Sequence, residues 1–319
     1  SPSYLRYDVL QPLNEYIDRD TSFDKNDFYP QFLNAFTKNG EIYGIPKDFG
    51  CYVLFYNIDM FKAAGLREPP KDWTELEEYS KKLTKDINGD GKTDQYGIVV
   101  EPSIDKLMPF VFQNMGRFQD KDGNLTLNTP EFQGALEYYY GLYRKKIATI
   151  PTDVSMNNIE EVFGRKRAAM VISGGWFVPQ LKDQYKDVNY KVAFLPKGKQ
   201  MATIAFTVSY SSPKENPLKE ESWKLLSYLT GKEGMTVWTS TGIAMPTRKS
   251  VASRLDYINH PEYKIFMGSV DFAKVFQVDY NERWFSITQS AMQAIFYERA
   301  DIPQKLKQME NDIKSLRLK

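Results

Sequence analysis

The sequence predicts an α/β protein built of two lobes, and three observations support this fold class. The chain has 319 residues, a length at which one hydrophobic core usually gives way to two. Short, strongly apolar segments alternate with longer segments in which apolar residues recur every three or four positions, as strands alternate with amphipathic helices. No internal repeat and no long Pro, Gly or Ser-rich linker interrupts this order. The lobe boundaries are therefore expected at strand-like crossings.

The first half of the chain contains the clearest elements. Residues 51–56 are six consecutive apolar or aromatic residues, a pattern typical of a strand covered on both faces. A helix is predicted over residues 58–65, and a second over residues 74–83, where Asp72 and Glu75 are placed to cap its first turn. Further helices are predicted over residues 130–145, 219–229, 231–240, 282–296 and 303–316, and further strands over residues 168–172, 190–194 and 206–210.

Composition excludes several classes of function. With 42 Lys+Arg against 41 Asp+Glu, the chain has no net field to hold a polyanion, so no nucleic-acid partner is expected. The mean hydropathy is -0.51, and no run approaches the roughly 20 apolar residues of a membrane span. One cysteine, Cys51, excludes an internal disulfide, and one histidine, His260, excludes multi-histidine metal sites. The 21 Tyr, 20 Phe and 5 Trp offer flat rings of the kind that stack on sugars.

Short motifs spread in order along nearly the whole chain resemble those of one known family. They are Glu41-Ile-Tyr-Gly-Ile-Pro-Lys-Asp-Phe-Gly50, Leu54-Phe-Tyr-Asn-Ile-Asp-Met-Phe61, Pro69-Pro-Lys-Asp-Trp-Thr-Glu-Leu76, Gln113-Asn-Met-Gly116, Phe163-Gly-Arg-Lys-Arg-Ala-Ala-Met-Val-Ile-Ser-Gly-Gly-Trp176 and Pro246-Thr-Arg248. This set is similar to the extracellular solute-binding proteins of carbohydrate ABC importers, the maltose-binding-protein superfamily. Each motif alone is weak, and the ordered set is specific.

The resemblance implies a type II periplasmic-binding-protein fold, in which two α/β lobes joined by hinge strands close on a ligand in the cleft between them. Hinge crossings are expected near Gly50, Ile204 and His260. Family members usually begin with a further strand, helix and strand of roughly seventy residues, so the resemblance implies a first lobe that lacks its N-terminal segment and has an open sheet edge. The expected lobes are residues 1–50 plus 205–260, and residues 51–204 plus 261–319.

The resemblance also implies ligand-binding positions near these crossings. Trp176 follows a strand and two glycines and matches a tryptophan that stacks on a sugar ring, and Trp284 matches a second sugar-facing aromatic residue. Asp48 is placed to accept two hydroxyl hydrogen bonds, with the alternative that it braces its turn. The remaining candidates are Lys47, Phe49, Tyr52, Gly175, Phe206 and Arg283. Three further tryptophans are interpreted as packing residues: Trp73, Trp223 and Trp238.

Residues 86–94 form the most specific local motif. Oxygen-bearing side chains occupy the first, third, fifth and ninth positions and glycine the sixth, which is the spacing of a calcium loop. The twelfth position is Gly97 instead of a bidentate glutamate. Two interpretations stay open: a structural calcium site, or a loop held by Asx turns. The calcium ligands would be Asp86, Asn88, Asp90, Lys92 through its carbonyl, and Asp94.

The leading functional hypothesis is a non-enzymatic receptor that captures a sugar or oligosaccharide and delivers it to an ABC permease. The first alternative is a glycoside hydrolase, which needs two carboxyl groups about 5 to 9 Å apart. The second keeps the fold and binds a polyamine or a metal ion, but Asp48 is the one clearly acidic candidate near the crossings. The resemblance further implies an extracellular or periplasmic protein, monomeric, and anchored as a lipoprotein in its full-length precursor.

Overall fold

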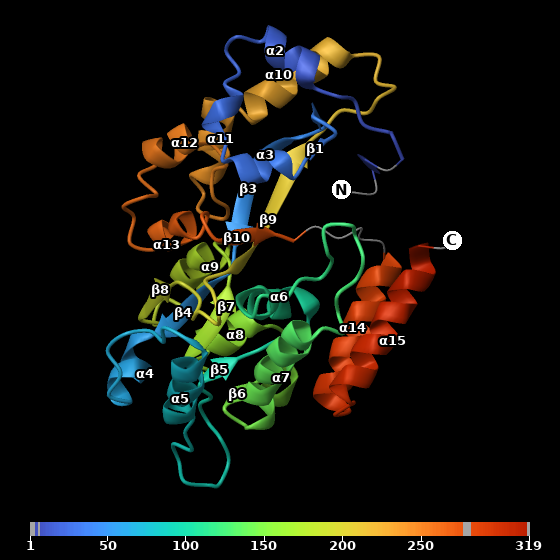
Figure 1. Ribbon diagram of the computed structural model, residues 1–319. Coiled ribbons are helices and arrows are strands. Elements are labelled where there is room, and N and C mark those ends of the chain that lie inside the picture. The colour runs from blue at the N-terminus through green and yellow to red at the C-terminus, as the bar shows by residue number, and fades with distance from the viewer. Residues whose placement is uncertain (1–3, 6, 277–281, 318–319) are drawn as a thin grey trace. The chain divides into compact units, whose positions relative to one another are not determined.

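The computed structural model describes residues 4–5, 7–276 and 282–317. The chain divides into two compact α/β units, each described on its own below (Figure 1). The first unit comprises Ser1–Cys51 and Ala205–Tyr280, and the second comprises Tyr52–Ile204 and Asn281–Lys319. The first two crossings lie within two residues of the expected positions.

The third crossing corrects the expected lobe boundary, because it lies some twenty residues beyond His260 and leaves residues 261–280 in the first unit. Their contacts explain this. The Cys51 thiol donates to the carbonyl of Phe266, and the strand that follows, β10 (Ala273–Val275), pairs with β9 (Thr203–Tyr210). Residues 261–276 therefore belong to the sheet and the core of the first unit.

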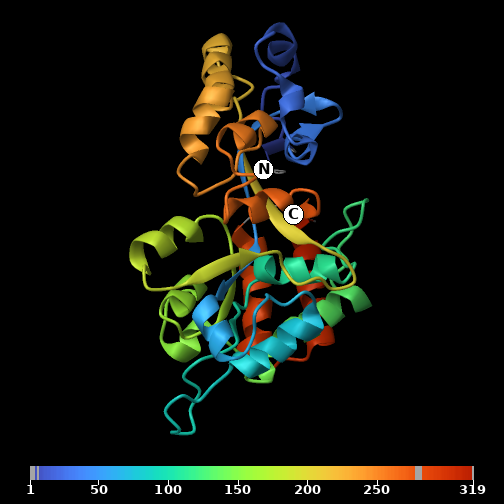
Figure 2. The ribbon, with the colours of Figure 1, turned by 90° about the vertical axis from the view of Figure 1, so that its left-hand side faces the viewer.

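The first unit is organised on a three-stranded sheet of order β10-β9-β3. β3 (Ile45–Cys51) runs antiparallel to β9, with Ile45 opposite Tyr210 and Cys51 opposite Ala205; Figure 2 shows the two strands side by side. The remaining elements are the hairpin β1 (Thr37–Lys38) and β2 (Glu41–Ile42), and the helices α2 (Asn14–Arg19), η1 (Lys25–Asp27), α3 (Pro30–Asn34), α10 (Lys219–Leu229), α11 (Lys232–Thr239), α12 (Lys249–Arg254) and α13 (Tyr263–Gly268).

A core of aromatic and aliphatic side chains lies beneath α2 and α10. Trp223 is 6% exposed, and its ring centroid lies 5.0 Å from that of Phe23 in an edge-on arrangement. The prediction that Trp223 is a packing residue is confirmed. The core of this cluster comprises Leu13, Tyr16, Ile17, Phe23, Phe28, Ile42, Ile45, Trp223, Leu226, Met235 and Val251.

The second unit is built around a five-stranded sheet of order β6-β5-β7-β4-β8. β4 (Val53–Asn57) is buried at all five positions, as the apolar run predicts, because it lies inside the sheet between antiparallel neighbours. The other strands are β5 (Ile98–Val99), β6 (Ala148–Thr149), β7 (Met170–Ser173) and β8 (Tyr190–Ala193). The helices are α4 (Ile58–Ala63), α5 (Trp73–Leu83), α6 (Ile104–Gln113), α7 (Pro130–Arg144), η2 (Pro151–Val154), α8 (Ile159–Gly164), α9 (Phe177–Gln184), α14 (Glu282–Tyr297) and α15 (Ile302–Arg317).

Local capping begins the predicted helices where expected. The Asn57 side chain accepts from the first amides of α4, and Asp72 accepts from the amide of Glu75 at 2.9 Å. The Glu75 carboxylate then reaches the amide of Lys71 at 2.8 Å, one residue earlier than in the usual capping box. Among the helices of the described ranges, none combines the length and apolar character that a membrane crossing requires.

Candidate functional site

Trp176 occupies the point where strand β7 passes into helix α9. It is the N-cap residue of α9, and 37% of its surface is exposed although Gly174 and Gly175 before it are buried. A Cβ atom at position 174 would lie 2.1 Å from the Trp176 ring. Glycine at this position therefore lets the indole ring fold back over the backbone while one part of it stays open to solvent.

The carboxylate of Glu160 and the ring of Tyr52 contact the indole, and Ser173 holds that carboxylate in place. Trp176 Nε1 donates to Glu160 Oε1 at 3.4 Å, and the hydroxyl of Ser173 donates to the same oxygen at 2.7 Å. The Tyr52 ring meets the indole edge-on, with centroids 6.1 Å apart. Because Glu160 begins α8 and Ser173 ends β7, the tertiary fold fixes the orientation of Trp176.

Tyr52 contacts a group of ionisable side chains in which Lys106 is buried and the carboxylates are half-buried. The Tyr52 hydroxyl donates to Asp105 Oδ2 at 2.6 Å, and burial, with Asp105 next in size, raises the tyrosine pKa well above its ordinary value. The ammonium of Lys106 lies 3.8 Å from the centre of the Tyr52 ring, a cation–π contact. Burial lowers the pKa of Lys106, against the opposing effect of the carboxylates of Asp105, Glu160 and Glu101.

Glu101 completes this group. Burial raises the pKa of its carboxyl, and within the described part of the chain its carboxylate oxygens have no hydrogen-bond donor. The carboxylates of Asp105, Glu160 and Glu101 all act electrostatically on the one buried lysine of this group, so hydrogen-bond acceptors outnumber the local cation. Such a surface suits a ligand that carries many hydroxyl donors. The Trp176 region, as we name it, consists of Tyr52, Glu101, Asp105, Lys106, Glu160 and Trp176.

In the first unit, a second tryptophan pairs with a predicted site residue. Trp238 on α11 is 41% exposed, and its Nε1 donates to Asp48 Oδ2 at 2.5 Å. The Lys47 ammonium pairs with the same carboxylate and lies 4.1 Å from the centre of the Trp238 ring. Trp238 is therefore not the packing residue that its helical spacing predicts. We name Lys47, Asp48 and Trp238 the Trp238 region.

The other predicted site residues lie in different surroundings. Phe49 is fully buried and stacks on Phe32 with centroids 4.4 Å apart. Trp284 is 4% exposed and packs on Phe118. Both rings belong to cores, which corrects the expectation that they face a ligand. Phe206 is half-buried on β9, Gly175 is buried, and Arg283 is exposed in the first turn of α14.

Sequence reasoning missed four members of the Trp176 region: Glu101, Asp105, Lys106 and Glu160. Glu101 follows β5, the next two lie in the first turn of α6, and Glu160 lies in the first turn of α8. No spacing along the chain links these three segments. An acidic residue soon after a strand end was the signal present in the sequence, and it is too common to identify a site.

The predicted calcium loop extends from the end of α5 (Figure 2). Its side-chain oxygens accept hydrogen bonds from the loop's own amides: those of Asp86 from Gly89 and Gly91, and that of Asp94 from Ile87. Across the residues described, no three acidic, His or Cys side chains form a group able to hold a metal ion. The geometry fits Asx turns, and calcium stays a prediction; no heat on titrating millimolar calcium into metal-stripped protein would contradict it.

The chain forms two α/β units linked by three crossings, which is the architecture that the resemblance to solute-binding proteins implies. The sequence profile of bacterial extracellular solute-binding proteins matches residues 2–265, and the chain belongs to that family.

Individual relatives agree with this assignment. A binding protein of Brucella abortus is 27% identical over 310 residues, which cover 93% of this chain and 72% of that protein. An arabinooligosaccharide-binding protein of Bacillus subtilis is 26% identical over 230 residues, 69% of this chain and 52% of that protein. In fold, the chain is similar to an ABC substrate-binding protein of Listeria monocytogenes solved with cycloalternan, with a TM-score of 0.87, 24% identity, and coverage of 98% of this chain and 81% of the other.

Proposed function

We propose that this solute-binding protein is the receptor of an ABC importer for a sugar or oligosaccharide. The observation that carries the proposal is the Trp176 region: an indole ring that is 37% exposed, next to three carboxylates and one buried lysine. A sugar offers an apolar ring face for stacking and hydroxyl donors at its rim, so the two parts of the region match the two parts of the ligand. The oligosaccharide-binding relatives support the same ligand class.

Calorimetric titration with a panel of neutral oligosaccharides tests the proposal. We expect one member of the panel to bind, and Trp176→Ala to weaken its affinity at least about tenfold, because the lost apolar contact is on the order of 1.5 kcal/mol or more. Tyr297→Ala is the matched control, since this ring is 47% exposed on α14 and contacts Thr152. Equal losses in both variants, or no binding by any sugar, would contradict the proposal.

We propose a binding protein without catalysis, although two carboxylates near a sugar also suit a glycoside hydrolase. Chromatography of the same mixtures after long incubation separates the two. Unchanged oligosaccharide agrees with a receptor, and released monosaccharide would show that the carboxylates cleave the ligand.

A polyamine is the second candidate ligand, and the structure adds an observation in its favour. The carboxylates of Asp105, Glu160 and Glu101 all act electrostatically on Lys106, the one cation of the Trp176 region, so the region is more acidic than the sequence motifs indicate. Spermidine in the titration panel tests this. Binding of spermidine with no response to any sugar would replace the sugar proposal, and competition between the two would place both at one site.

The rest of the proposal concerns the permease partner, the oligomeric state and the membrane anchor. We propose that it delivers its ligand to the permease subunits of the importer at the membrane, acts as a monomer, and is anchored as a lipoprotein in its full-length precursor. Sedimentation of the purified chain tests the monomer, and mass spectrometry of the N-terminus of the precursor isolated from its cells tests the lipid.

A further inference from the structure

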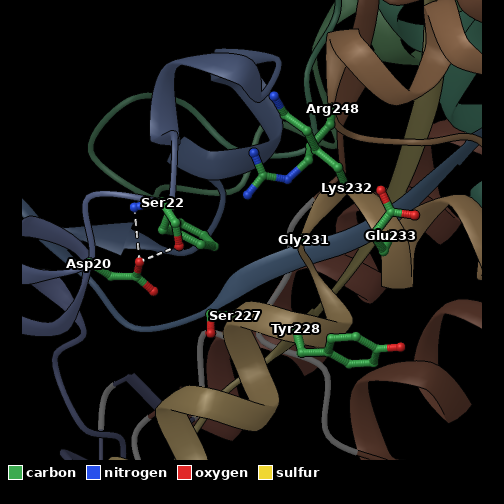
Figure 3. A pocket seen from close by; sticks show the side chains of 9 residues that line it. Asp20, Ser22, Ser227, Tyr228, Gly231, Lys232, Glu233 and Arg248 are labelled. Carbon is green, nitrogen blue, oxygen red and sulfur yellow. Dashed lines mark hydrogen bonds between the residues drawn. The ribbon is translucent and has the colours of Figure 1, made fainter.

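A cavity of about 300 Å³ opens in the first unit at the junction of α10 and α11 (Figure 3). None of the residues that line it belongs to the Trp238 region or to the predicted site. The volume is at the lower end of the range of small-molecule sites. The lining residues are Asp20, Ser22, Phe23, Ser227, Tyr228, Gly231, Lys232, Glu233 and Arg248.

Arg248 is the central polar group of this cavity. The residue is 2% exposed, and its Nε donates to the carbonyl of Thr230 at 2.6 Å while Nη1 donates to the carbonyl of Asp24 at 2.8 Å. Nη1 also pairs with Asp27 at 3.3 Å. For Nη2, the described residues supply no acceptor, and Figure 3 shows the guanidinium pointing into the cavity. This nearly buried cation, paired with Asp27 and packed on the ring of Phe28, thus keeps an unbonded Nη2 group beside the cavity.

The first turn of α11 points donors toward the same place. Gly231 is its N-cap residue and no side chain caps the turn; the first intrahelical bond to Gly231 comes from the amide of Met235. In the described chain, the amides of residues 232–234 are left without a partner, as at any uncapped helix start. They carry the positive end of the helix dipole and favour an anion.

The two carboxylates that line the cavity bond to other groups and not to Arg248 Nη2 or the first amides of α11. The Asp20 carboxylate already accepts from the amide and the hydroxyl of Ser22, at 3.0 and 2.5 Å, and from the Trp223 indole at 3.2 Å. Glu233 pairs with Arg254 at 2.7 Å. By contrast, the ammonium of Lys232 has no acceptor among the residues that the structure describes. The lining carboxylates are thus engaged, while one cation and the Arg248 Nη2 group are not.

We propose that this cavity binds a tetrahedral oxyanion of the phosphate class. Arg248 Nη2 and the amides at the start of α11 would donate to its oxygens, and Lys232 would supply the second charge. The site is separate from sugar binding, because none of its residues belongs to the Trp176 region. It gives the protein a second, ionic ligand whose occupancy varies with phosphate concentration.

Inorganic phosphate titrated into the full chain at low ionic strength tests the site, with sodium chloride at matched ionic strength as the screening control. We expect saturable binding and shifted amide resonances at residues 231–234. Lys232→Glu should weaken the affinity at least about tenfold, because an attractive contact becomes a repulsive one. Lys224→Glu, an equal charge change at an exposed position of α10 outside the cavity, should change it less than about twofold.

Arg248→Lys tests the guanidinium, with the melting temperature measured alongside because this side chain is buried. A folded Arg248→Lys protein with unaltered phosphate affinity would overturn the proposal, as would equal losses in the two glutamate variants or no saturable binding. Vesicles containing phosphatidylglycerol distinguish a lipid phosphate from a free one: retention of the protein that Lys232→Glu abolishes would identify the lipid as source. Since sugar titrations report on the Trp176 region, failure of either proposal leaves the other measurable.

Discussion

The Trp176 region and the Trp238 region contain the same side-chain types in different proportions. Each has a partly exposed tryptophan that donates to a carboxylate, Glu160 in one and Asp48 in the other. In the Trp238 region, one lysine pairs with that one carboxylate. In the Trp176 region, three carboxylates act electrostatically on one buried lysine.

This difference indicates where binding capacity lies. Asp48 is 6% exposed and is already occupied by an ammonium and an indole N–H group, so its acceptor capacity is largely consumed inside the unit. The carboxylates near Trp176 outnumber the local cation, and Glu101 has no donor in the described structure. An unfilled acceptor close to an aromatic ring costs stability in the free protein and gains a partner when a hydroxyl ligand binds.

Removing the lysine of the Trp176 region should have the largest effect on stability. Lys106→Met keeps most of the side-chain volume and leaves Asp105, Glu160 and Glu101 without their cation. We expect the free energy of unfolding at neutral pH to fall by about 2 kcal/mol, because the cation–π contact with the Tyr52 ring and the hydrogen bond to the carbonyl of Ile172 at 3.4 Å are lost. Relief of the buried charge offsets part of that loss, since burial lowers the pKa of Lys106. Urea denaturation of the variant and of Lys62→Met, an exposed position on α4, measures the difference.

The pH dependence of that loss checks its cause. Burial already raises the pKa of Glu101, and removal of a cation raises it further. The deficit of Lys106→Met should therefore shrink as the pH falls and these carboxyls take up protons. A deficit that is constant with pH would mean that Lys106 stabilises through packing alone.

The equivalent change in the Trp238 region should lower the free energy of unfolding by less. Lys47→Met removes the ammonium from Asp48 but leaves the indole N–H donor of Trp238 in place. We expect a loss of about 1 kcal/mol, the magnitude of one hydrogen bond to a group that keeps a second partner. Denaturant titration of Lys47→Met and Lys106→Met under the same conditions provides the test. A larger loss for Lys47→Met would reverse the comparison between the two regions.

The parts of the molecule that the sequence predicts are those that neighbouring residues determine. The apolar run of β4, the cap at Asp72 and the strand-end position of Trp176 each depend on a few consecutive residues. All three occur in the structure as expected. The unit that contains residues 261–276 is predicted wrongly because their partners are distant in sequence, such as β9 beside β10.

Contacts between residues distant in sequence also explain the errors among the predicted site residues. Phe49 and Asp48 are neighbours on β3, yet one ring stacks on Phe32 of α3 and the other side chain meets Trp238 of α11. Both partners come from packing that no local pattern encodes. Glu160 contacts Trp176 and Glu101 acts on Lys106 from separate segments for the same reason, so an aromatic residue of the site could be predicted and the acidic residues of its region could not.

The smallest expected effect on stability is that of Glu101→Gln, which should raise the free energy of unfolding instead of lowering it. Because burial raises the folded-state pKa of Glu101 above its unfolded value, its contribution to stability is fully present below the unfolded pKa. It is lost as the pH rises through the folded pKa. Glu101→Gln is uncharged at every pH and avoids that loss. We expect it to raise the free energy of unfolding at neutral pH by up to about 1 kcal/mol, and to give no gain in acid.

Thermal unfolding across this pH range measures the gain, with Glu78→Gln at an exposed position of α5 as the control. The same substitution should weaken sugar binding, because an amide is a poorer hydroxyl acceptor than a carboxylate. A more stable variant with weaker binding would show that the Glu101 carboxylate destabilises the free protein and contributes to ligand binding. If Glu101→Gln instead loses stability at neutral pH, the Glu101 carboxylate is a structural partner of Lys106, and the surplus of acceptors that distinguishes this region from the Trp238 region does not exist.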